Sequence, residues 1–249
     1  MTSTAATRPR PLFTPPARWR VPVERAVVIV LFLAVVGFVV RASPVDAAVS
    51  ADLDALHVGA LGAVCSVVYR VFEPGPAILL TIVVTAIVWA RTRRLPVAVA
   101  FAGVVAVTWI PSAVLKIVVG RPRPDASVLP HPFVPAQPDA SFPSGHVVFV
   151  TALLLAALML VADPRRRLVA AVIGGVGVLA VATALCIDGV HWPADVVASV
   201  LWALAVAPAA RLLWVDVILR PVLRRLEQTG RHRSGRTRPS GRRRGEDTW

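Results

Sequence analysis

The sequence predicts an all-α membrane protein, a bundle of about six transmembrane helices with one further helix at the membrane interface. Three observations support this fold class. The 249 residues are 56% hydrophobic, whereas soluble globular domains are about 45–50% apolar. The apolar residues form long runs, and most runs approach the ~20 residues that a helix needs to cross a bilayer. The arginines gather between the runs and at the two ends, so a second, soluble domain has no room.

Residues 1–73 divide into segments of different polarity. Residues 1–24 are basic and rich in proline, which predicts disorder. A first span is expected over 25–40, and because no clear cleavage site follows it, we interpret it as a retained helix and not a signal peptide. The stretch 50–73 contains Asp52, Asp54, His57 and Arg70. It is too polar for lipid on every side, which favours an interfacial or packed amphipathic helix.

The remaining spans follow from the later apolar runs. They are expected over 76–90, 96–119, 145–162, 168–187 and 193–215. Seven prolines make 120–145 a loop. The membrane domain therefore covers 25–216, and the arginine-rich tail at 217–249 is expected to be disordered.

Loop charge predicts the orientation of the bundle. The N-terminal segment, Arg91–Arg94, Arg165–Arg167 and the tail all fall on one side of a six-span arrangement. Excess arginine marks the cytoplasmic side, so both termini are expected there. The tail is expected to contact anionic lipid headgroups. Nucleic acid is not an expected partner, because the tail lacks interleaved aromatic residues.

Three polar clusters lie on the opposite side, where ionisable groups at span ends call for an explanation. The first is Lys116 with Arg121 and Arg123, and Lys116 is the only lysine in the chain. A lysine at the end of a helix can extend its amine to the interface without any function. Cations that converge from a helix end and a proline-stiffened loop also suit a phosphate group.

The second and third clusters each begin a helix. In Pro143-Ser144-Gly145-His146 the serine is expected to cap the helix, whose free N–H groups favour an anion. In His191-Trp192-Pro193-Ala194-Asp195, Pro193 suits a first helical turn. The carboxylate of Asp195 can then reach back and hold one tautomer of His191. Taken alone, each cluster is equally well explained as a helix cap beside an interfacial histidine.

Together the clusters resemble the type 2 phosphatidic acid phosphatase (PAP2) family of membrane phosphatases. The matching pattern is Lys116-x6-Arg123-Pro124, then Pro143-Ser144-Gly145-His146, then His191-x3-Asp195, and the resemblance covers about residues 50–210. It implies a bacterial-type lipid phosphatase that acts on an isoprenyl diphosphate or a phosphatidate through a phosphohistidine, without a metal or another cofactor. The source expected from the arginine-, alanine- and valine-rich composition is a GC-rich bacterium.

The resemblance also implies a role for each matching residue. Lys116 and Arg123 bind the phosphate, together with Ser144 and the backbone of Gly145, and Arg121 is a further candidate. His146 is the general acid, His191 the nucleophile, and Asp195 orients His191.

One position departs from the family pattern. The family usually has Ser-Arg where this chain has Ala184-Leu185, and that arginine is a third phosphate ligand. A hydrogen bond to a charged group contributes about 1.5–3 kcal/mol. Loss of this arginine therefore predicts about ten- to hundredfold weaker binding of the transition state, unless Arg121 or Arg70 supplies the charge. Asp188 adds negative charge nearby. We therefore keep two alternatives beside the phosphatase: an inactive lipid-phosphate-binding protein, and a phosphotransferase that uses an alcohol acceptor.

Overall fold

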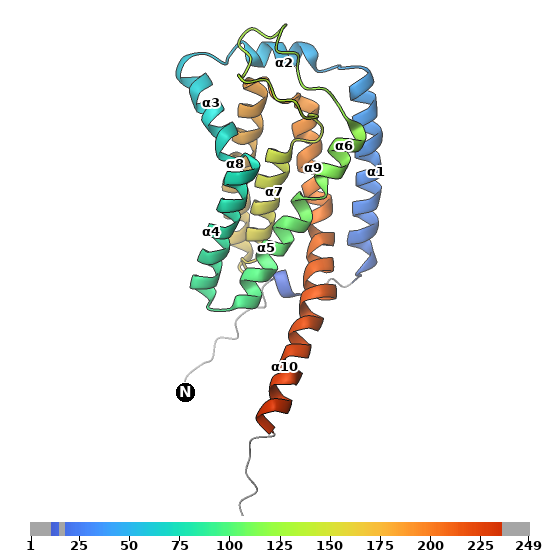
Figure 1. The fold of residues 1–249 in the computed structure, drawn as a ribbon, viewed down its shortest axis with the longest axis vertical. Helices are drawn as coiled ribbons and strands as arrows, with labels where there is room; N and C mark the ends of the chain where they lie inside the picture. The colour runs from blue at the N-terminus through green and yellow to red at the C-terminus, as the bar shows by residue number, and fades with distance from the viewer. Residues whose placement is uncertain (1–10, 15–17, 236–249) are drawn as a thin grey trace, which may run out of the picture.

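The computed structural model describes residues 11–14 and 18–235, and every regular element within these ranges is helical (Figure 1). This confirms the all-α membrane bundle. The elements that cross it are α1 (Arg20–Ala42), α4 (Pro74–Thr92), α5 (Leu95–Trp109) with α6 (Ser112–Val119), α7 (Gly145–Leu158), α8 (Pro164–Ile187) and α9 (Pro193–Arg211). Ile110 and Pro111 separate α5 from α6, which together form one apolar span.

The helices alternate in direction, so the connections gather at two ends (Figure 1). We call the end with α2 (Ala47–Asp54) and the loop 120–144 the site end. The other end, where α1 begins and α10 (Arg220–Gly235) extends from the bundle, is the tail end. All three motif clusters lie at the site end, as the six-span arrangement predicted.

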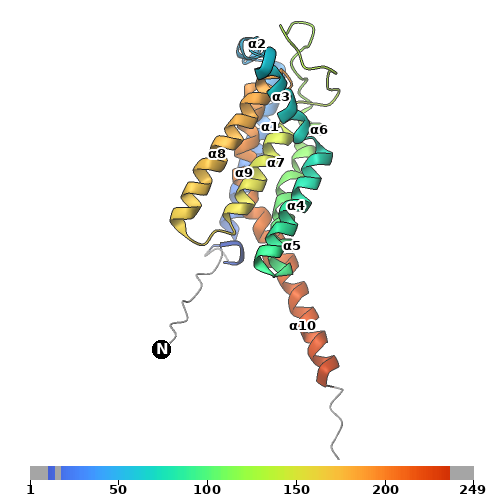
Figure 2. The ribbon, with the colours of Figure 1, turned by 90° about the vertical axis from the view of Figure 1, so that its left-hand side faces the viewer.

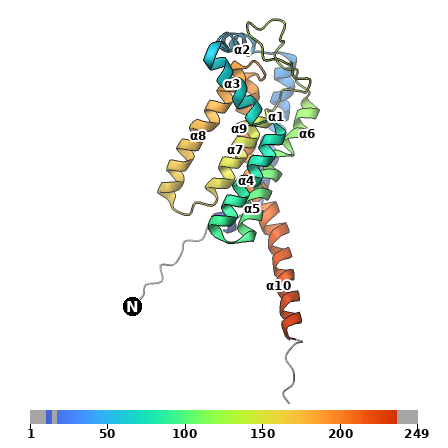
Figure 3. The same cartoon turned by 60° about the vertical axis from the view of Figure 1, so that its left-hand side comes forward.

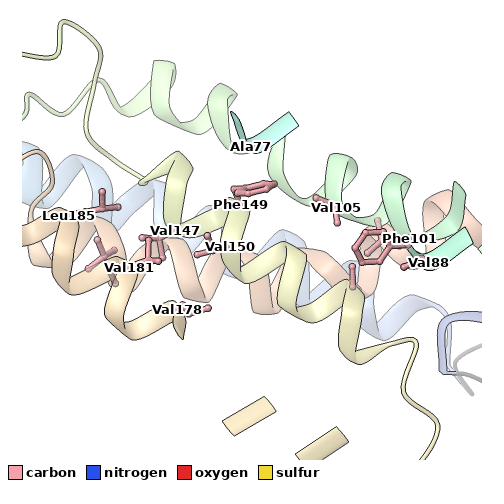
Figure 4. Close-up of a cluster of buried hydrophobic side chains, with 14 of the residues drawn as sticks. Ala77, Val88, Phe101, Val105, Val147, Phe149, Val150, Val178, Val181 and Leu185 are labelled. Atoms are coloured by element: carbon pink, nitrogen blue, oxygen red, sulfur yellow. The ribbon is translucent and has the colours of Figure 1, made fainter. Parts of the chain in front are cut away.

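Helix α7 lies in the middle and contacts α5, α8 and α9. It has 14 residues and ends at Leu158, shorter than the expected span over 145–162. Its buried side chains interlock with α5 and α8 in the main apolar core (Figure 4). The core members drawn there include Phe101 and Val105 of α5, Val147, Phe149 and Val150 of α7, and Val178, Val181 and Leu185 of α8. This packing fixes where the first turn of α7 lies, and His146 with it.

The first half of α8 stands away from α7 and α9 (Figures 2 and 3). Large apolar side chains such as Val172, Ile173 and Val176 are more than half exposed there. In water such a surface would be costly, but lipid solvates it well, while the helix satisfies its own backbone groups. The chain is an integral membrane protein.

The stretch 50–73 differs from the single helix that the sequence predicted. It contains two helices, α2 and α3 (Gly59–Val71), bent by 116° at His57 and its neighbours. Helix α2 lies across the site end, and α3 packs beside the last turns of α8, where Cys65 meets Ala184 and Ile187 (Figure 1). Of the polar residues that made this stretch ambiguous, Asp54 and His57 bond to His131 of the loop, whereas Asp52 and Arg70 are exposed.

Both chain ends differ from the expected disorder over part of their length. The region 1–24 contains a 3₁₀ turn at Pro11–Phe13, and α1 begins at Arg20. Leu12 is buried, and its carbonyl accepts a hydrogen bond from Arg211 Nε at 2.9 Å. In the tail, a π-helical segment (Leu212–Leu219) and α10 continue α9 to Gly235. The expected disorder of 1–10 and 236–249 lies outside the described residues.

Candidate active site

The first two clusters line one cavity at the site end, and the third is buried directly behind Arg123 and His146. The end of α6 and the loop after it supply Lys116 and Arg123, and the first turn of α7 supplies His146. The turn between α8 and α9 supplies His191, which Gly189 makes possible by taking a φ of +65°. The rings of His146 and His191 lie edge to face with their centroids 6.2 Å apart. The structure therefore brings together the residues in which the family pattern is intact.

His191 is fully buried and lies beside Arg123, the arginine of the family pattern. Its Nε2 is 3.4 Å from Nη1 of Arg123, which also donates to the carbonyl of Val190 at 2.6 Å. Burial lowers the pKa of His191 well below its usual value, and the charges of Arg123 and Lys116 lower it further. The imidazole is therefore neutral at physiological pH, the state in which a ring nitrogen has a free lone pair.

Asp195 faces the other nitrogen of His191. Its Oδ2 lies 3.5 Å from Nδ1, which is longer than a good hydrogen bond, and Nδ1 has no hydrogen-bond partner among the described residues. The same oxygen accepts the backbone N–H of Trp192 at 3.0 Å, because Asp195 occupies the third position of α9. The helix start thus holds the carboxylate near the histidine, but the expected hydrogen bond that would fix one tautomer of His191 is not formed.

The start of α7 has the predicted cap. The hydroxyl of Ser144 accepts the N–H of Val147, and its own N–H donates to Ser199 on α9 at 2.8 Å. Helical geometry leaves the N–H groups of Gly145 and His146 without intrahelical acceptors. His146 stacks on Tyr69 with ring centroids 4.7 Å apart, and its Nε2 has no partner within the described part of the chain. Both residues line the cavity.

Lys116 and Arg123 converge as predicted, but a carboxylate already lies between them. Asp139 accepts a hydrogen bond from Lys116, and it also accepts from Arg123 Nη2 at 2.6 Å and Nε at 3.0 Å. These contacts lower the pKa of Asp139 to about 2, against the opposing effect of burial. No motif in the sequence singles out this residue, which is one of two aspartates in the proline-rich loop.

Arg121 is placed differently from the third phosphate ligand that the sequence proposed. Its side chain is 1% exposed, and it lies between the carboxylates of Asp46 and Asp195, at 2.5 Å and 2.7 Å, with its guanidinium over the Trp192 ring. Asp46 comes from the start of α2, far away in the chain, and also accepts the N–H of Ala194 at 3.0 Å. Arg121 therefore contacts Asp195, the carboxylate that lies beside His191.

The position of the missing arginine is apolar and closed. Leu185 is fully buried in the main core, with Val147 and Val181 nearby (Figure 4). Asp188, one turn later, pairs with His57 at 2.9 Å and accepts from Ser66 at 3.1 Å. Arg70, the other proposed replacement, is exposed and lies over Phe133. In the described residues, Lys116 and Arg123 are the cations that line the cavity.

The cavity has a volume of about 640 Å³ and two unlike halves. Its polar half contains Lys116, Arg123 and His146 together with the carboxylates of Asp139 and Glu73. Its apolar half is formed where α4 begins and where α5 meets α6, by Phe72, Pro74, Ile78, Trp109, Ile110 and Ala113. Ile78 and Ile110 are more than half exposed on the lateral surface of the bundle. The cavity thus joins a cationic centre to a surface that faces lipid.

Comparisons with known proteins agree with these features. A solved structure, described as the first transmembrane PAP2 type phosphatidylglycerolphosphate phosphatase from Bacillus subtilis, has the same fold. It matches with a TM-score of 0.63 and 19% identity over 75% of this chain and 94% of that chain. No curated protein matches the sequence. The model of the PAP2 superfamily matches residues 93–218, which hold all three motifs and just over half of the chain. The chain therefore belongs to the PAP2 superfamily.

Proposed function

We propose that the protein is a membrane lipid phosphatase that hydrolyses a lipid phosphate or diphosphate through a phosphohistidine intermediate. One observation carries this proposal. A buried, neutral His191 has its Nε2 3.4 Å from Arg123 Nη1 and its ring 6.2 Å from the ring of His146, and both neighbours line the cavity together with Lys116. A nucleophile, a proton donor and fixed cations around one space are the parts that phosphoryl transfer requires.

The reaction divides into two displacements. In the first, the Nε2 lone pair of His191 attacks phosphorus, the bond from phosphorus to the lipid oxygen breaks, and a proton on His146 passes to that oxygen. Asp195 stabilises the positive charge that forms on the His191 ring. In the second, His146 takes a proton from water, the water oxygen attacks phosphorus, and the P–N bond breaks to release inorganic phosphate and neutral His191.

The chain's own groups supply the electrostatic stabilisation, so the proposed reaction needs no metal. Lys116 and Arg123 carry positive charge to the phosphoryl oxygens. The N–H groups of Gly145 and His146 point from the positive end of the α7 dipole toward the same space. Preorganised donors of this kind stabilise the charge of the transition state without rearrangement.

The apolar half of the cavity supports a lipid as the substrate. A phosphate on an acyl or isoprenyl chain can keep its chain in the membrane and reach the cations past Ile78 and Ile110. In a bacterial plasma membrane, the loop arginines would place this site on the extracytoplasmic face and both termini in the cytoplasm. The arginines of α10 and the residues after it would then contact anionic headgroups.

Leu185 favours a second candidate, a protein that binds lipid phosphate without turning it over. The missing arginine removes a charge from the site and leaves the binding cations in place. A phosphotransferase differs only in the last step, where an alcohol replaces water.

Release of inorganic phosphate by the purified protein in EDTA tests these functions. The panel contains a polyprenyl diphosphate, a polyprenyl phosphate, phosphatidate and phosphatidylglycerol phosphate, each with and without an added alcohol. His191→Ala should abolish release, whereas His131→Ala, which alters an exposed histidine of the nearby loop, should leave it unchanged. Wild-type protein that releases no phosphate from any substrate but binds these lipids would favour the binding protein. Transfer of phosphate to the alcohol would identify the transferase.

A further inference from the structure

The phosphate-binding edge of Arg123 is already occupied. Arginine binds oxyanions best through parallel N–H groups on one edge of its guanidinium. Here Nε and Nη2 both donate to Oδ1 of Asp139, at 3.0 Å and 2.6 Å, while Nη1 is anchored to the carbonyl of Val190. The other carboxylate oxygen of Asp139 accepts from Lys116. One carboxylate therefore takes the donors from both cations that a phosphoryl group would use.

A bound phosphoryl group must displace this carboxylate. Both are anions with oxygens about equally spaced, and they compete for the same N–H groups. Displacement is possible because the side chain of Asp139 is 51% exposed and belongs to the loop 120–144, which has no helix to hold it. The cations themselves are only 18% and 9% exposed, so their positions are fixed by packing.

The competition affects ligands unequally. A lipid phosphate brings apolar chain that fills the other half of the cavity, and burial of that chain offsets the loss of the Asp139 contacts. Inorganic phosphate has no such group. After hydrolysis the product phosphate meets the returning carboxylate with nothing else to hold it.

We propose that Asp139 is a specificity-determining residue, an internal anion that makes the cationic site accept phosphate attached to a lipid and reject free phosphate. This inference rests on the proposed phosphatase function. Its consequence is weak product inhibition: the carboxylate takes back Lys116 and Arg123 as phosphate leaves. When a competing state occupies a site for about nine-tenths of the time, the apparent dissociation constant is about tenfold higher than the intrinsic one.

The test compares full-length wild type, Asp139→Asn and Asp125→Asn. Asparagine keeps the shape of Asp139 and removes its charge. Asp125 is an exposed carboxylate in the same loop, whose only contacts in the described structure are with Ser127, so its variant controls for a lost loop charge. The dissociation constants of orthovanadate and inorganic phosphate are measured by their effect on thermal unfolding in detergent. Inhibition of lipid hydrolysis by phosphate is measured alongside.

Asp139→Asn should bind orthovanadate and phosphate about tenfold more tightly than wild type, and phosphate should inhibit it at correspondingly lower concentration. Asp125→Asn should match wild type. Unchanged or weaker anion binding by Asp139→Asn would overturn the inference, because a residue that only supports the loop would weaken the site when altered. Failure of all three proteins to bind either anion would overturn the phosphate site itself, and the proposed function with it. Asp139→Ala provides a second variant in case the amide makes a new hydrogen bond.

Discussion

Replacing Arg121 with methionine separates the role that the structure gives this residue from the role that the sequence proposed. Methionine is about as long as the arginine stem and is apolar, so it removes the charge and the hydrogen bonds with little loss of packing. Arg121 contacts Asp195 at 2.7 Å and Asp46 at 2.5 Å, and its side chain is 1% exposed. The substitution therefore leaves two buried carboxylates without their shared partner.

The expected magnitude follows from that burial. Removing one member of a buried ion pair destabilises a protein by about 3–5 kcal/mol. For a chain of 249 residues, 1 kcal/mol shifts the unfolding temperature by about 2–4 °C, so we expect a decrease of roughly 6–20 °C. Asp195 would also lose part of its aim at His191. We expect kcat to fall about ten- to a hundredfold and KM to change less than about threefold, because Arg121 does not line the substrate cavity's cationic centre.

Thermal unfolding in detergent and steady-state phosphate release measure both effects. Arg94→Met, which removes an exposed arginine at the tail end, controls for the loss of one positive charge. Arg121→Lys should be intermediate, since it keeps the charge and loses the paired hydrogen bonds. A rise in KM with unchanged kcat would show that Arg121 binds the substrate phosphate, as the sequence suggested. Unchanged stability and unchanged kcat would refute the network altogether.

Three further predictions concern charge in and around the site. Leu185→Arg restores the family charge at a fully buried position. It should lower the unfolding temperature by several degrees and raise kcat/KM about tenfold. A kcat/KM equal to that of wild type would show that the arginine cannot reach the phosphate. Burial raises the pKa of Asp188 to about 6 against the opposing contacts with Ser66 and His57. Because its pKa is raised in the folded state, Asp188 makes a contribution to stability that is complete below pH ~4 and is lost as the pH rises through about 6. Asp188→Asn should therefore be more stable than wild type at pH 7.5, by up to about 3 kcal/mol, with the difference vanishing near pH 4; a constant difference would contradict the shift. Finally, the lowered pKa of His191 predicts that kcat/KM stays constant as the pH falls well below 6.5. A decrease in kcat/KM near pH 6.5 that is assigned to His191 would contradict this prediction.

The fold was largely predictable because its main signals are local. Runs of apolar residues give the spans, and the prolines and glycine of the clusters give the helix starts at Gly145 and Pro193. Asp195 could be placed near His191 from spacing alone, because His191 closely precedes the helix whose first turn contains Asp195. These predictions depend on residues close together in the chain, where helical geometry fixes distances.

The rest of the site depends on contacts that spacing cannot reveal. Asp139 and Lys116 are separated by 23 residues, most of them in the irregular loop, and Asp46 and Arg121 by 75 residues. Asp46 directly precedes α2, which lies across the site end, and the bend after α2 falls in the stretch whose polar residues left the sequence ambiguous. In the same way, Arg121 and Arg123 belong to one short run that the sequence suggests for phosphate binding, yet the two arginines pair with different carboxylates.

The charge balance that results would let the proposed phosphatase work without arginine at 185. The charge of Arg121 is held by Asp46 and Asp195, behind the nucleophile, and contributes little to the phosphate. Lys116 and Arg123 face the cavity, and Asp139 offsets one of their two charges until a ligand enters. When the carboxylate leaves, Lys116 and Arg123 present two positive charges to a phosphate monoester that carries up to two negative ones, and Glu73 is the carboxylate that remains in the cavity lining. The core around Leu185 then remains apolar, which avoids the cost of a third buried charge, and the helix start of α7 provides the remaining donors.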